Sequence, residues 1–369
     1  MKKKLFVFLG LMLILLVISI FKLYDSEERI VYANELSNGD NTSINFSNEF
    51  ILKGEGFVLE DELMRYPFRI RQSGKYLYVL DLHGEEHFCH IYSKEKLTHI
   101  ASFAKRGNGP KEVLQAINLH VVSNDSIYLF DTGKKEISLW DFSEEDTTMI
   151  LKQTYKMKDD IILSSNCTWC SDTTFFFTDK SGENRILKCN RDGEIIDKIG
   201  RIPIKREIDK MMNGILARAW NSYLNFNPKV QILAIATQLG DVFEIYNIKN
   251  NAYRVIYGPK GEPEYKVSRD GYSIPTGIMG YGDIQVTSKY IYAVFNGRSF
   301  KEIMKDPQNT PQGGENLLVY DHNGAPICKL KLDHSISGIH IDEENGIFWA
   351  TDVNSEEQIV LYEIPKQLL

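Results

Sequence analysis

The densest group of side chains that could bind a metal lies near residue 85. It contains three histidines, two glutamates and a cysteine: His83, Glu85, Glu86, His87, Cys89 and His90. Imidazole and thiolate groups are common ligands of zinc and other transition metals. Alternation along a strand, however, places His87 and Cys89 on the face opposite His90. We therefore expect that these groups do not meet at one ion, and we predict neither a metal site nor a cofactor.

A glycine-rich segment, Gly107-Asn108-Gly109-Pro110-Lys111-Glu112, follows Lys105 and Arg106. Glycines beside basic residues can form a phosphate-binding loop, but such a loop leads into the N-terminus of a helix. The residues after Glu112 indicate a strand instead. The segment therefore predicts a turn whose shape is fixed by Pro110.

Five cysteines leave the disulfide pattern open. Their number is odd, so they cannot all pair within one chain: Cys89, Cys167, Cys170, Cys189 and Cys328. Cys167 and Cys170 have a redox-like spacing but lie in a strand-rich region without the βαβ unit of such motifs. We interpret them as packed thiols or one local disulfide. No Ser-His-Asp order or paired-carboxylate motif stands out, so we predict no catalytic residue.

All of these segments belong to one recurring pattern. An apolar, aromatic-rich strand ends in a polar residue six times, at Asp81, Asp131, Asp179, Thr237, Asn296 and Asp352. The intervals of 48 to 59 residues suit a four-stranded blade with its loops. Six copies predict an all-β fold, a six-bladed β-propeller of four-stranded antiparallel blades. The strands are clearest in the second copy, at 117–122, 126–130, 136–141 and 149–156.

The sixth copy lacks one strand. It contains three predicted strands, at 336–341, 347–351 and 358–364. Residues 44–59 contain two apolar runs, 50–52 and 56–59, that could supply the fourth. We predict that an N-terminal strand from this segment closes the ring and removes a free sheet edge, so that the propeller spans residues 44–369.

Composition and the N-terminus indicate a folded, exported protein. The chain has 369 residues, is 43% hydrophobic and carries a net charge of -7, which disfavours nucleic acid as a partner. Three lysines at positions 2–4 precede an apolar run from Leu5 to Phe21. This order predicts a signal peptide or signal anchor over residues 1–24, followed by a tether over 25–43. The propeller is then expected to be extracytoplasmic, either periplasmic or in the cell envelope. It would meet the membrane only through its N-terminal segment.

Two motifs resemble a known family. They are the segment 107–112 and the strand Asp125-Ser126-Ile127-Tyr128-Leu129-Phe130-Asp131. Together they are similar to the TolB-like six-bladed propeller family of Bacteroidetes, which typically carries Gly-x-Gly-Pro-x-Glu before an apolar strand and an aromatic-aspartate motif. Residues 290–298 also look like that family's fifth blade. The resemblance implies an exported propeller. Many family members are lipoproteins, but no cysteine follows the apolar run of this chain to accept a lipid.

A ligand site is expected at one mouth of the central channel. In a propeller, the connections into each innermost strand and between the second and third strands surround this mouth. The positions that map there are Arg65, Tyr66, Arg106, Trp220, Asn221, Tyr281, Asp283 and Arg298. Aromatic faces beside arginine and asparagine suit sugars, peptides or anionic groups. Packing between blades is the alternative for Trp220 and Tyr281.

These observations favour a non-enzymatic binding or scaffold protein that engages a protein or glycan of the cell envelope. The channel mouth and a long loop in blade five, residues 297–315, are the expected contact surfaces. A second insertion, 201–219, predicts a short helix at 205–212. The alternative function is a calcium-dependent lactonase or lyase, as in other six-bladed propellers. Asn221 and Asp283 would then supply two ligands, although calcium takes about six to eight oxygens.

Overall fold

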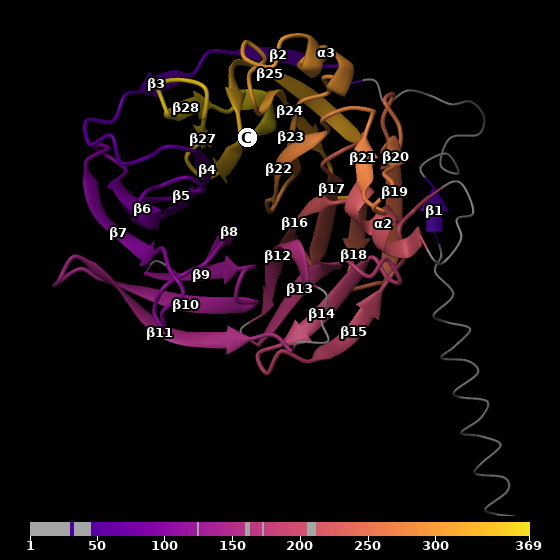
Figure 1. Ribbon diagram of the computed structural model, residues 1–369. Coiled ribbons are helices and arrows are strands. Elements are labelled where there is room, and N and C mark those ends of the chain that lie inside the picture. Colours follow the sequence, from indigo (N-terminus) through magenta and orange to yellow (C-terminus); the bar gives the residue numbers. More distant parts are fainter. Residues whose placement is uncertain (1–29, 33–45, 124, 159–162, 172, 205–211) are drawn as a thin grey trace, which may run out of the picture.

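The computed structural model describes residues 30–32, 46–123, 125–158, 163–171, 173–204 and 212–369. Six antiparallel sheets are arranged as a ring around a central channel, as Figure 1 shows. Each sheet has four antiparallel strands that follow one another outwards from the channel, and two of the sheets carry a fifth, parallel strand at the outer edge. The predicted six-bladed propeller is therefore confirmed.

Blades one to three are each built from one stretch of chain. Blade one contains β4 (Pro67–Ser73), β5 (Tyr76–Asp81), β6 (His87–Ser93) and β7 (His99–Lys105). Blade two contains β8 (Ala116–Val121), β9 (Ser126–Asp131), β10 (Glu136–Ser143) and β11 (Thr148–Lys156). Blade three contains β12 (Leu163–Ser171), β13 (Thr174–Asp179), β14 (Ile186–Asn190) and β15 (Ile195–Ile199). The four predicted strands of blade two agree with these bounds to within about two residues.

Blades four to six also use segments from the N-terminal part of the chain. Blade four contains β16 (Ser222–Asn227), β17 (Ile232–Thr237), β18 (Val242–Asn247) and β19 (Ala252–Tyr257). Blade five contains β22 (Tyr281–Val286), β23 (Ile291–Phe295), β24 (Gly314–Tyr320) and β25 (Pro326–Ile336). Blade six contains β26 (Gly338–Asp342), β27 (Ile347–Thr351) and β28 (Ile359–Glu363), and a 3-10 helix, η3 (Lys366–Leu368), follows it.

The ring is closed by an N-terminal strand, as predicted. β3 (Glu55–Phe57) pairs antiparallel with β28 and completes blade six. The other apolar run has a different position: β2 (Glu49–Leu52) pairs parallel with β25 and adds a fifth strand to blade five. Within the predicted tether, β1 (Ile30–Tyr32) pairs parallel with β19 of blade four. The predicted signal segment, residues 1–24, lies outside the described residues.

The recurring aromatic-rich motif is the second strand of each blade. All six residues of β5 and of β17 are buried, because neighbouring blades cover both faces of these strands. Outer strands alternate instead: β11 has exposed side chains along most of its length. The hydrophobic core is thus divided into clusters that fill the space between successive blades.

In blades one and two, the aspartate that ends the motif holds the start of its own blade. Asp81 accepts hydrogen bonds from the backbone N–H groups of Arg65 at 2.6 Å and Tyr66 at 2.7 Å, just before β4. Asp131 does the same for Leu114 at 2.7 Å and Gln115 at 2.9 Å, before β8. Charged acceptors make strong hydrogen bonds with backbone N–H groups. In these two blades the aspartate therefore fixes the start of the innermost strand.

The glycine-rich segment before blade two is filled by its own glutamate. The Glu112 carboxylate accepts a hydrogen bond from the Gly109 N–H at 2.9 Å. Gly107 has a φ of 151°, and a Cβ there would lie 2.0 Å from a Glu112 carboxylate oxygen. Lys134 donates to the carbonyl oxygens of Gly109 and Glu112. The Gly-x-Gly-Pro-x-Glu segment is therefore a self-contained turn, as the sequence indicates.

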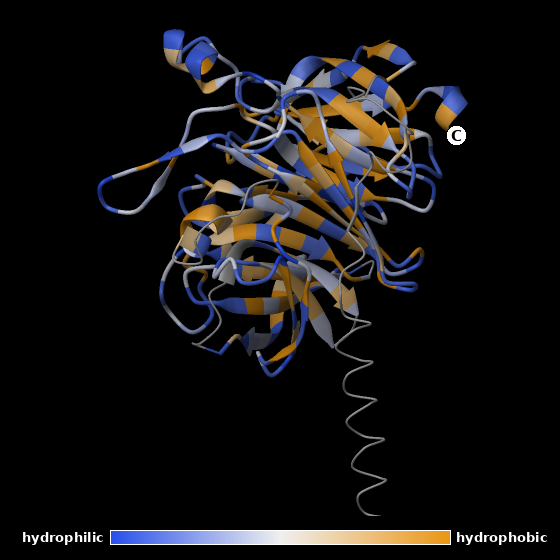
Figure 2. Cartoon of the chain, turned by 90° about the vertical axis from the view of Figure 1, so that its right-hand side faces the viewer, coloured by the Kyte–Doolittle hydropathy of each residue, from blue (hydrophilic) through white to orange (hydrophobic). Residues whose placement is uncertain are grey.

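The insertions lie on one face of the ring. α2 (Asn213–Ala219) precedes β16, a hairpin of β20 (Tyr265–Val267) and β21 (Ser273–Pro275) precedes β22, and α3 (Phe300–Lys305) lies in the blade-five loop. α3 begins with a capping box between Ser299 and Glu302. Figure 2 shows α3 and the hairpin projecting from this face. The helix predicted at 205–212 falls on residues of which 205–211 lie outside the described part.

The remaining sequence motifs are part of the core. All five cysteines are free, and Cys167 and Cys189 are buried in one cluster between blades two and three. His90 is buried, its Nδ1 lies 2.9 Å from Ser102 Oγ, and burial lowers its pKa to about 4. No helix in the described ranges is long and apolar enough to cross a membrane.

Candidate binding site at the channel mouth

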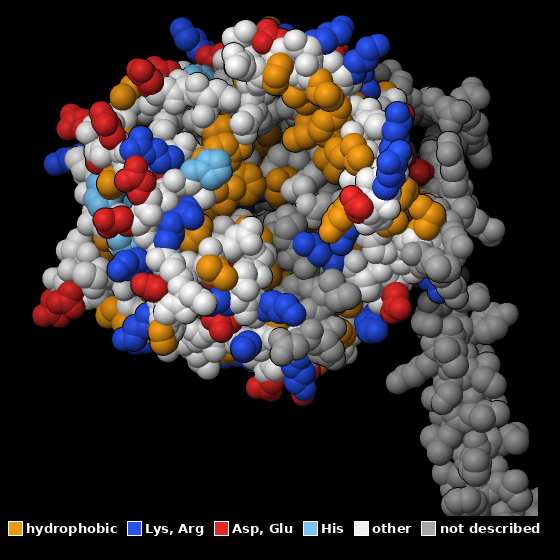
Figure 3. All heavy atoms as spheres, viewed as in Figure 1, with side chains coloured by type: hydrophobic (Ala, Val, Ile, Leu, Met, Phe, Trp, Pro, Cys, Tyr) orange, Lys and Arg blue, Asp and Glu red, His pale blue; other side chains and the backbone are white. Residues whose placement is uncertain are grey.

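The channel mouth is formed where the chain enters the innermost strands. The loops before β4, β8 and β16 meet on the same face as α2, α3 and the β20–β21 hairpin. Figure 3 shows hydrophobic side chains gathered around a hollow at the centre of this face, with charged side chains further out. The mouth therefore differs in chemistry from the rim around it.

A row of aromatic side chains extends from the rim into this hollow. The ring of exposed His83 lies 4.7 Å from that of Tyr66, and Tyr66 lies 6.3 Å from Phe68. Phe68, in turn, lies 6.4 Å from Tyr223, which belongs to blade four. Tyr66, Phe68 and Tyr223 are half-buried, so each ring keeps part of its surface exposed. We call these four residues the aromatic row.

Arg69 fixes the inner end of the aromatic row. Its guanidinium carbon lies 3.7 Å from the ring centroid of Phe68 and 4.5 Å from that of Tyr223. Arg69 is only 2% exposed and donates to the carbonyl oxygens of Ser337 at 2.9 Å and Gly282 at 2.8 Å. Cation–π contacts are strongest when the cation is removed from water. The arginine therefore holds rings from blades one and four in fixed positions.

The outer end of the row is joined to blade five. The Tyr66 hydroxyl donates to the Gln312 side chain. Burial raises the pKa of Tyr66, with a further contribution from Tyr223, so the phenol stays protonated and can donate at neutral pH. Gln312 is held by a hydrogen bond from its own N–H to Asn354 at 2.7 Å. The long blade-five loop is thereby anchored beside the aromatic row.

Two predicted site residues lie in the core and not at the surface. Trp220 is 1% exposed and packs in the cluster between blades three and four. Tyr281 is 4% exposed, and its hydroxyl donates to Asp241 at 3.2 Å. Both side chains pack between blades, which is the alternative that the sequence left open.

The polar residues predicted at the mouth are each bound to a neighbour. Arg65 pairs with Glu85 at 3.2 Å, Arg298 pairs with Glu315, and Asn221 donates to Gln238 at 2.6 Å. Arg106 lies 3.7 Å above the Phe88 ring and donates to the carbonyl oxygen of Leu82. These side chains form the rim, and of the predicted residues only Tyr66 belongs to the aromatic row.

Asp283 lies below the mouth, inside the channel. It is 3% exposed, pairs with Arg69 and Arg71 at 3.4 Å each, and accepts from the N–H of Ile339 at 3.0 Å. Asp283 and Asn221 thus have separate partners and do not share a common set of oxygen ligands. Among the residues that the structure describes, no group of three or more His, Cys, Asp and Glu side chains could hold a metal ion.

Three residues of the aromatic row were missed by the sequence prediction. His83 was considered only as a metal ligand, and Phe68 and Tyr223 were not considered for the mouth. Phe68 and Tyr223 are each the second residue of an innermost strand, one position past the point where the chain enters it. An aromatic residue next to such a point is the sequence signal that could have identified them.

The comparisons agree with this architecture. Residues 45–344 match the model of a family described as TolB-like six-bladed propellers. The chain belongs to this family. This chain is similar to the solved structure of a member of the DUF4221 family from Bacteroides vulgatus, with a TM-score of 0.58 and 14% identity. The match covers 88% of this chain and 98% of that one. A protein from Bacteroides fragilis named as exported has a TM-score of 0.54, 12% identity, and coverage of 86% and 99%. No curated protein sequence matches this chain.

At these identities the solved structures show that the fold of the TolB-like propeller is shared, and no more. The function has to be argued from the residues at the mouth.

Proposed function

We propose that this TolB-like propeller is an extracytoplasmic, non-enzymatic binding or scaffold protein that engages a protein or glycan of the cell envelope through its channel mouth and blade-five loop. The observation that carries the proposal is the aromatic row, with three half-buried rings, of which Phe68 and Tyr223 are held by Arg69 and Tyr66 by Gln312. Preformed aromatic surfaces bind flat, apolar faces at low entropic cost, because little ordering is left to be done on binding.

The polar groups around the row suit the same ligands. Tyr66 and Gln312 form one hydrogen-bonded pair, and Asn221 and Gln238 form another near the mouth. Hydroxyl and amide groups are donors and acceptors for sugar hydroxyls and peptide groups alike. α3 carries Met304, which is 78% exposed, and provides an apolar surface on the blade-five loop. Stacking and hydrogen bonding therefore lie side by side, which is typical of glycan and peptide sites.

The proposed compartment rests on the N-terminal sequence. The three lysines and the apolar run to Phe21 have the order of an export signal. A reporter enzyme that is active only outside the cytoplasm, fused after residue 45, tests this. An inactive reporter in intact cells would contradict export.

Replacement of Tyr66 tests the binding function. Screening the purified protein against oligosaccharides and envelope proteins identifies a ligand, and titration calorimetry then measures its affinity. We expect Tyr66→Ala to weaken binding about tenfold or more, because a stacking contact is worth about 1 kcal/mol and the link to Gln312 is also lost. Tyr66→Phe, which keeps the ring, should lose less.

Ile196→Ala is the matched control. Ile196 is 50% exposed on β15, at the outer edge of blade three, and should bind like the unchanged protein. Equal affinity of Tyr66→Ala and Ile196→Ala would remove the aromatic row from the site.

A further inference from the structure

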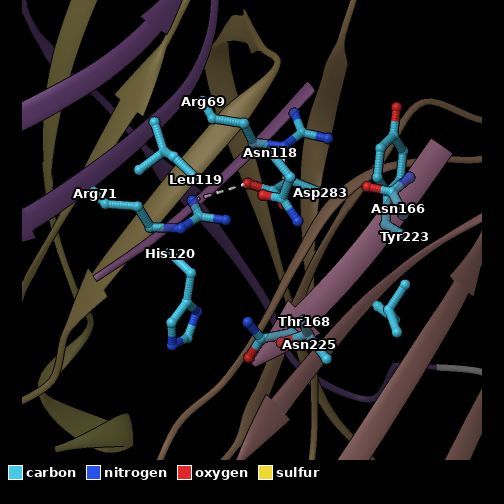
Figure 4. Close-up of a pocket in the computed structure, with 11 residues that line it drawn as sticks. Arg69, Arg71, Asn118, Leu119, His120, Asn166, Thr168, Tyr223, Asn225 and Asp283 are labelled. Atoms are coloured by element: carbon cyan, nitrogen blue, oxygen red, sulfur yellow. Dashed lines mark hydrogen bonds and ion pairs between the residues drawn. The ribbon is translucent and has the colours of Figure 1, made fainter. Parts of the chain in front are cut away.

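The wall of the channel below the mouth is almost entirely polar. Figure 4 shows the pocket, in which the guanidinium groups of Arg69 and Arg71 lie on either side of the Asp283 carboxylate. His120 of blade two and Asn225 of blade four also line it. The pocket has a volume of about 10 Å³, close to what one water molecule requires.

The charges in this pocket do not balance. Two arginines face one carboxylate, which leaves one positive charge in excess among the residues that line it. Asp283 is shared between both arginines and also accepts from the N–H groups of Ile284 and Ile339. Charges in a protein interior are normally paired, because an unpaired charge there loses its hydration without compensation. The excess positive charge therefore calls for an anionic partner that the residues of the pocket do not supply.

Several hydrogen-bond donors in and beside the pocket also lack a partner. Arg71 donates through Nη1 to the carbonyl oxygens of Ile70 and Ile339, but its Nε and Nη2 make no hydrogen bond within the described part of the chain. The Asn225 side chain accepts from the N–H of Val286, and its Nδ2 has no acceptor among these residues. The buried Nδ1 of His340, next to Ile339, is also without a partner there. Of these groups only His340 Nδ1 is fully buried, whereas Arg71 and Asn225 are partly buried, so their free donors face the channel and can bind a water or an ion.

The neighbouring histidines do not change the sign of the site. Burial and then Arg71 lower the pKa of His120 to about 4, and the same causes lower the pKa of His340 to about 3. Both imidazoles are therefore neutral at physiological pH, and the excess positive charge belongs to the arginines. Neutral imidazole still provides one N–H donor.

We propose that this channel pocket binds one small inorganic anion of halide size, with Arg71 as its principal partner and Asn225 and His120 as the polar wall. The anion would neutralise the excess charge and accept hydrogen bonds from donors that have no acceptor. The anion would take the place of the one water that the pocket has room for, and the small volume excludes polyatomic anions. The proposal concerns the interior of the channel and does not rest on the function proposed for the mouth.

Thermal unfolding of the full-length protein in halide solutions tests the proposal. The unfolding midpoint should rise with the concentration of bromide or chloride and then reach a plateau. Gluconate, which is too large for the pocket, keeps the ionic strength constant. At about a hundred times the dissociation constant the rise should be about 4 °C. Arg71→Met should remove the halide dependence, whereas Arg65→Met, which removes an exposed arginine of the rim, should keep it. A midpoint that does not respond to halide would overturn the proposal.

Crystals grown in bromide give a second test that requires no variant. A bromide peak in the anomalous difference map beside Arg71 supports the site. A water in its place, or bromide that appears only at molar concentration as an adventitious ion, overturns it. This measurement also decides the matter if Arg71→Met does not fold.

Discussion

This propeller has two buried clusters of charged side chains that are built from similar residues. They differ in how far their charges and hydrogen bonds are balanced within the protein. Between blades three and four, Arg185 binds Glu244 through Nε at 2.9 Å and Nη2 at 2.7 Å, and it also donates to Ser222 at 2.7 Å and to the Trp220 carbonyl oxygen at 3.0 Å. Tyr253 donates to the second carboxylate oxygen of Glu244 at 2.8 Å. In this cluster one cation faces one anion, and the donors of the guanidinium are used.

The channel cluster has the opposite character. Its two arginines share Asp283, and Arg71 keeps donors without acceptors in the described residues. The ion-paired side chains of both clusters are at most 12% exposed, so burial alone does not separate a structural charge from a ligand-binding one. The separating property is whether charge and hydrogen bonds are already balanced within the protein. The Arg185–Glu244 cluster is complete and joins two blades, whereas the channel cluster is incomplete without an added anion.

The largest effect is expected at the complete cluster. Glu244→Gln keeps the shape of the side chain but leaves Arg185 as a buried, unpaired charge. We expect a loss of about 3–5 kcal/mol in the free energy of unfolding, measured by urea titration. Replacing both residues, in Arg185→Met with Glu244→Gln, should recover part of that loss because the unpaired charge is removed. A cost below about 1 kcal/mol for Glu244→Gln would mean that the two clusters do not differ as described.

A smaller effect, with a defined pH range, is expected in the channel. His120 and His340 have pKa values of about 4 and 3 in the folded protein, against an ordinary value near 6.5 when unfolded. Between these values the unfolded chain binds protons that the folded protein does not. Stability should therefore fall as the pH drops from about 6.5 to 4, by up to about 1.4 kcal/mol per pH unit for each histidine.

The same experiment on Arg71→Met sharpens the comparison. Removing Arg71 takes away the positive charge that disfavours imidazolium, so the pH dependence of stability should become shallower. Urea titrations at several pH values, in gluconate to keep the anion site empty, measure this. An identical pH dependence in both proteins would show that Arg71 does not act on these histidines.

The sequence predicted the frame of the molecule better than it predicted the site. The second strand of each blade is covered on both faces, and its continuous apolar run, as in 76–81, is visible without knowledge of the partners. A missing strand also predicted ring closure, but it did not predict which apolar run would close the ring. Gly56 and Phe57 of β3 pair with β28, whereas Phe50 of β2 pairs with β25. Both runs are short and apolar, and only the length of the connection to β4 distinguishes them.

The site depends on contacts between distant parts of the chain. Phe68 and Tyr223 meet through Arg69 across two blades, and Arg71 and Asp283 do so within the channel. One sequence can mark such residues singly, but it does not show which of them meet across the channel. Trp220 was assigned to the mouth because it precedes β16, but α2 directs the chain so that this ring faces the core. The position of Trp220 in the sequence left both directions of its side chain open, which is why packing between blades stood as the alternative.

The smallest effect is expected for the ion pair at the rim, which completes the comparison. Arg65 and Glu85 lie 3.2 Å apart, with side chains 56% and 79% exposed. Water solvates both charges whether or not they pair, so Glu85→Gln should change the free energy of unfolding by less than about 1 kcal/mol. The backbone N–H of Arg65 remains bound to Asp81, so the start of β4 is unaffected. This pair has the same charges as Arg185 and Glu244, and parallel urea titrations compare Glu85→Gln with Glu244→Gln. If both substitutions cost a similar free energy of unfolding, burial and hydrogen-bond balance do not set the energies of charged groups in this propeller.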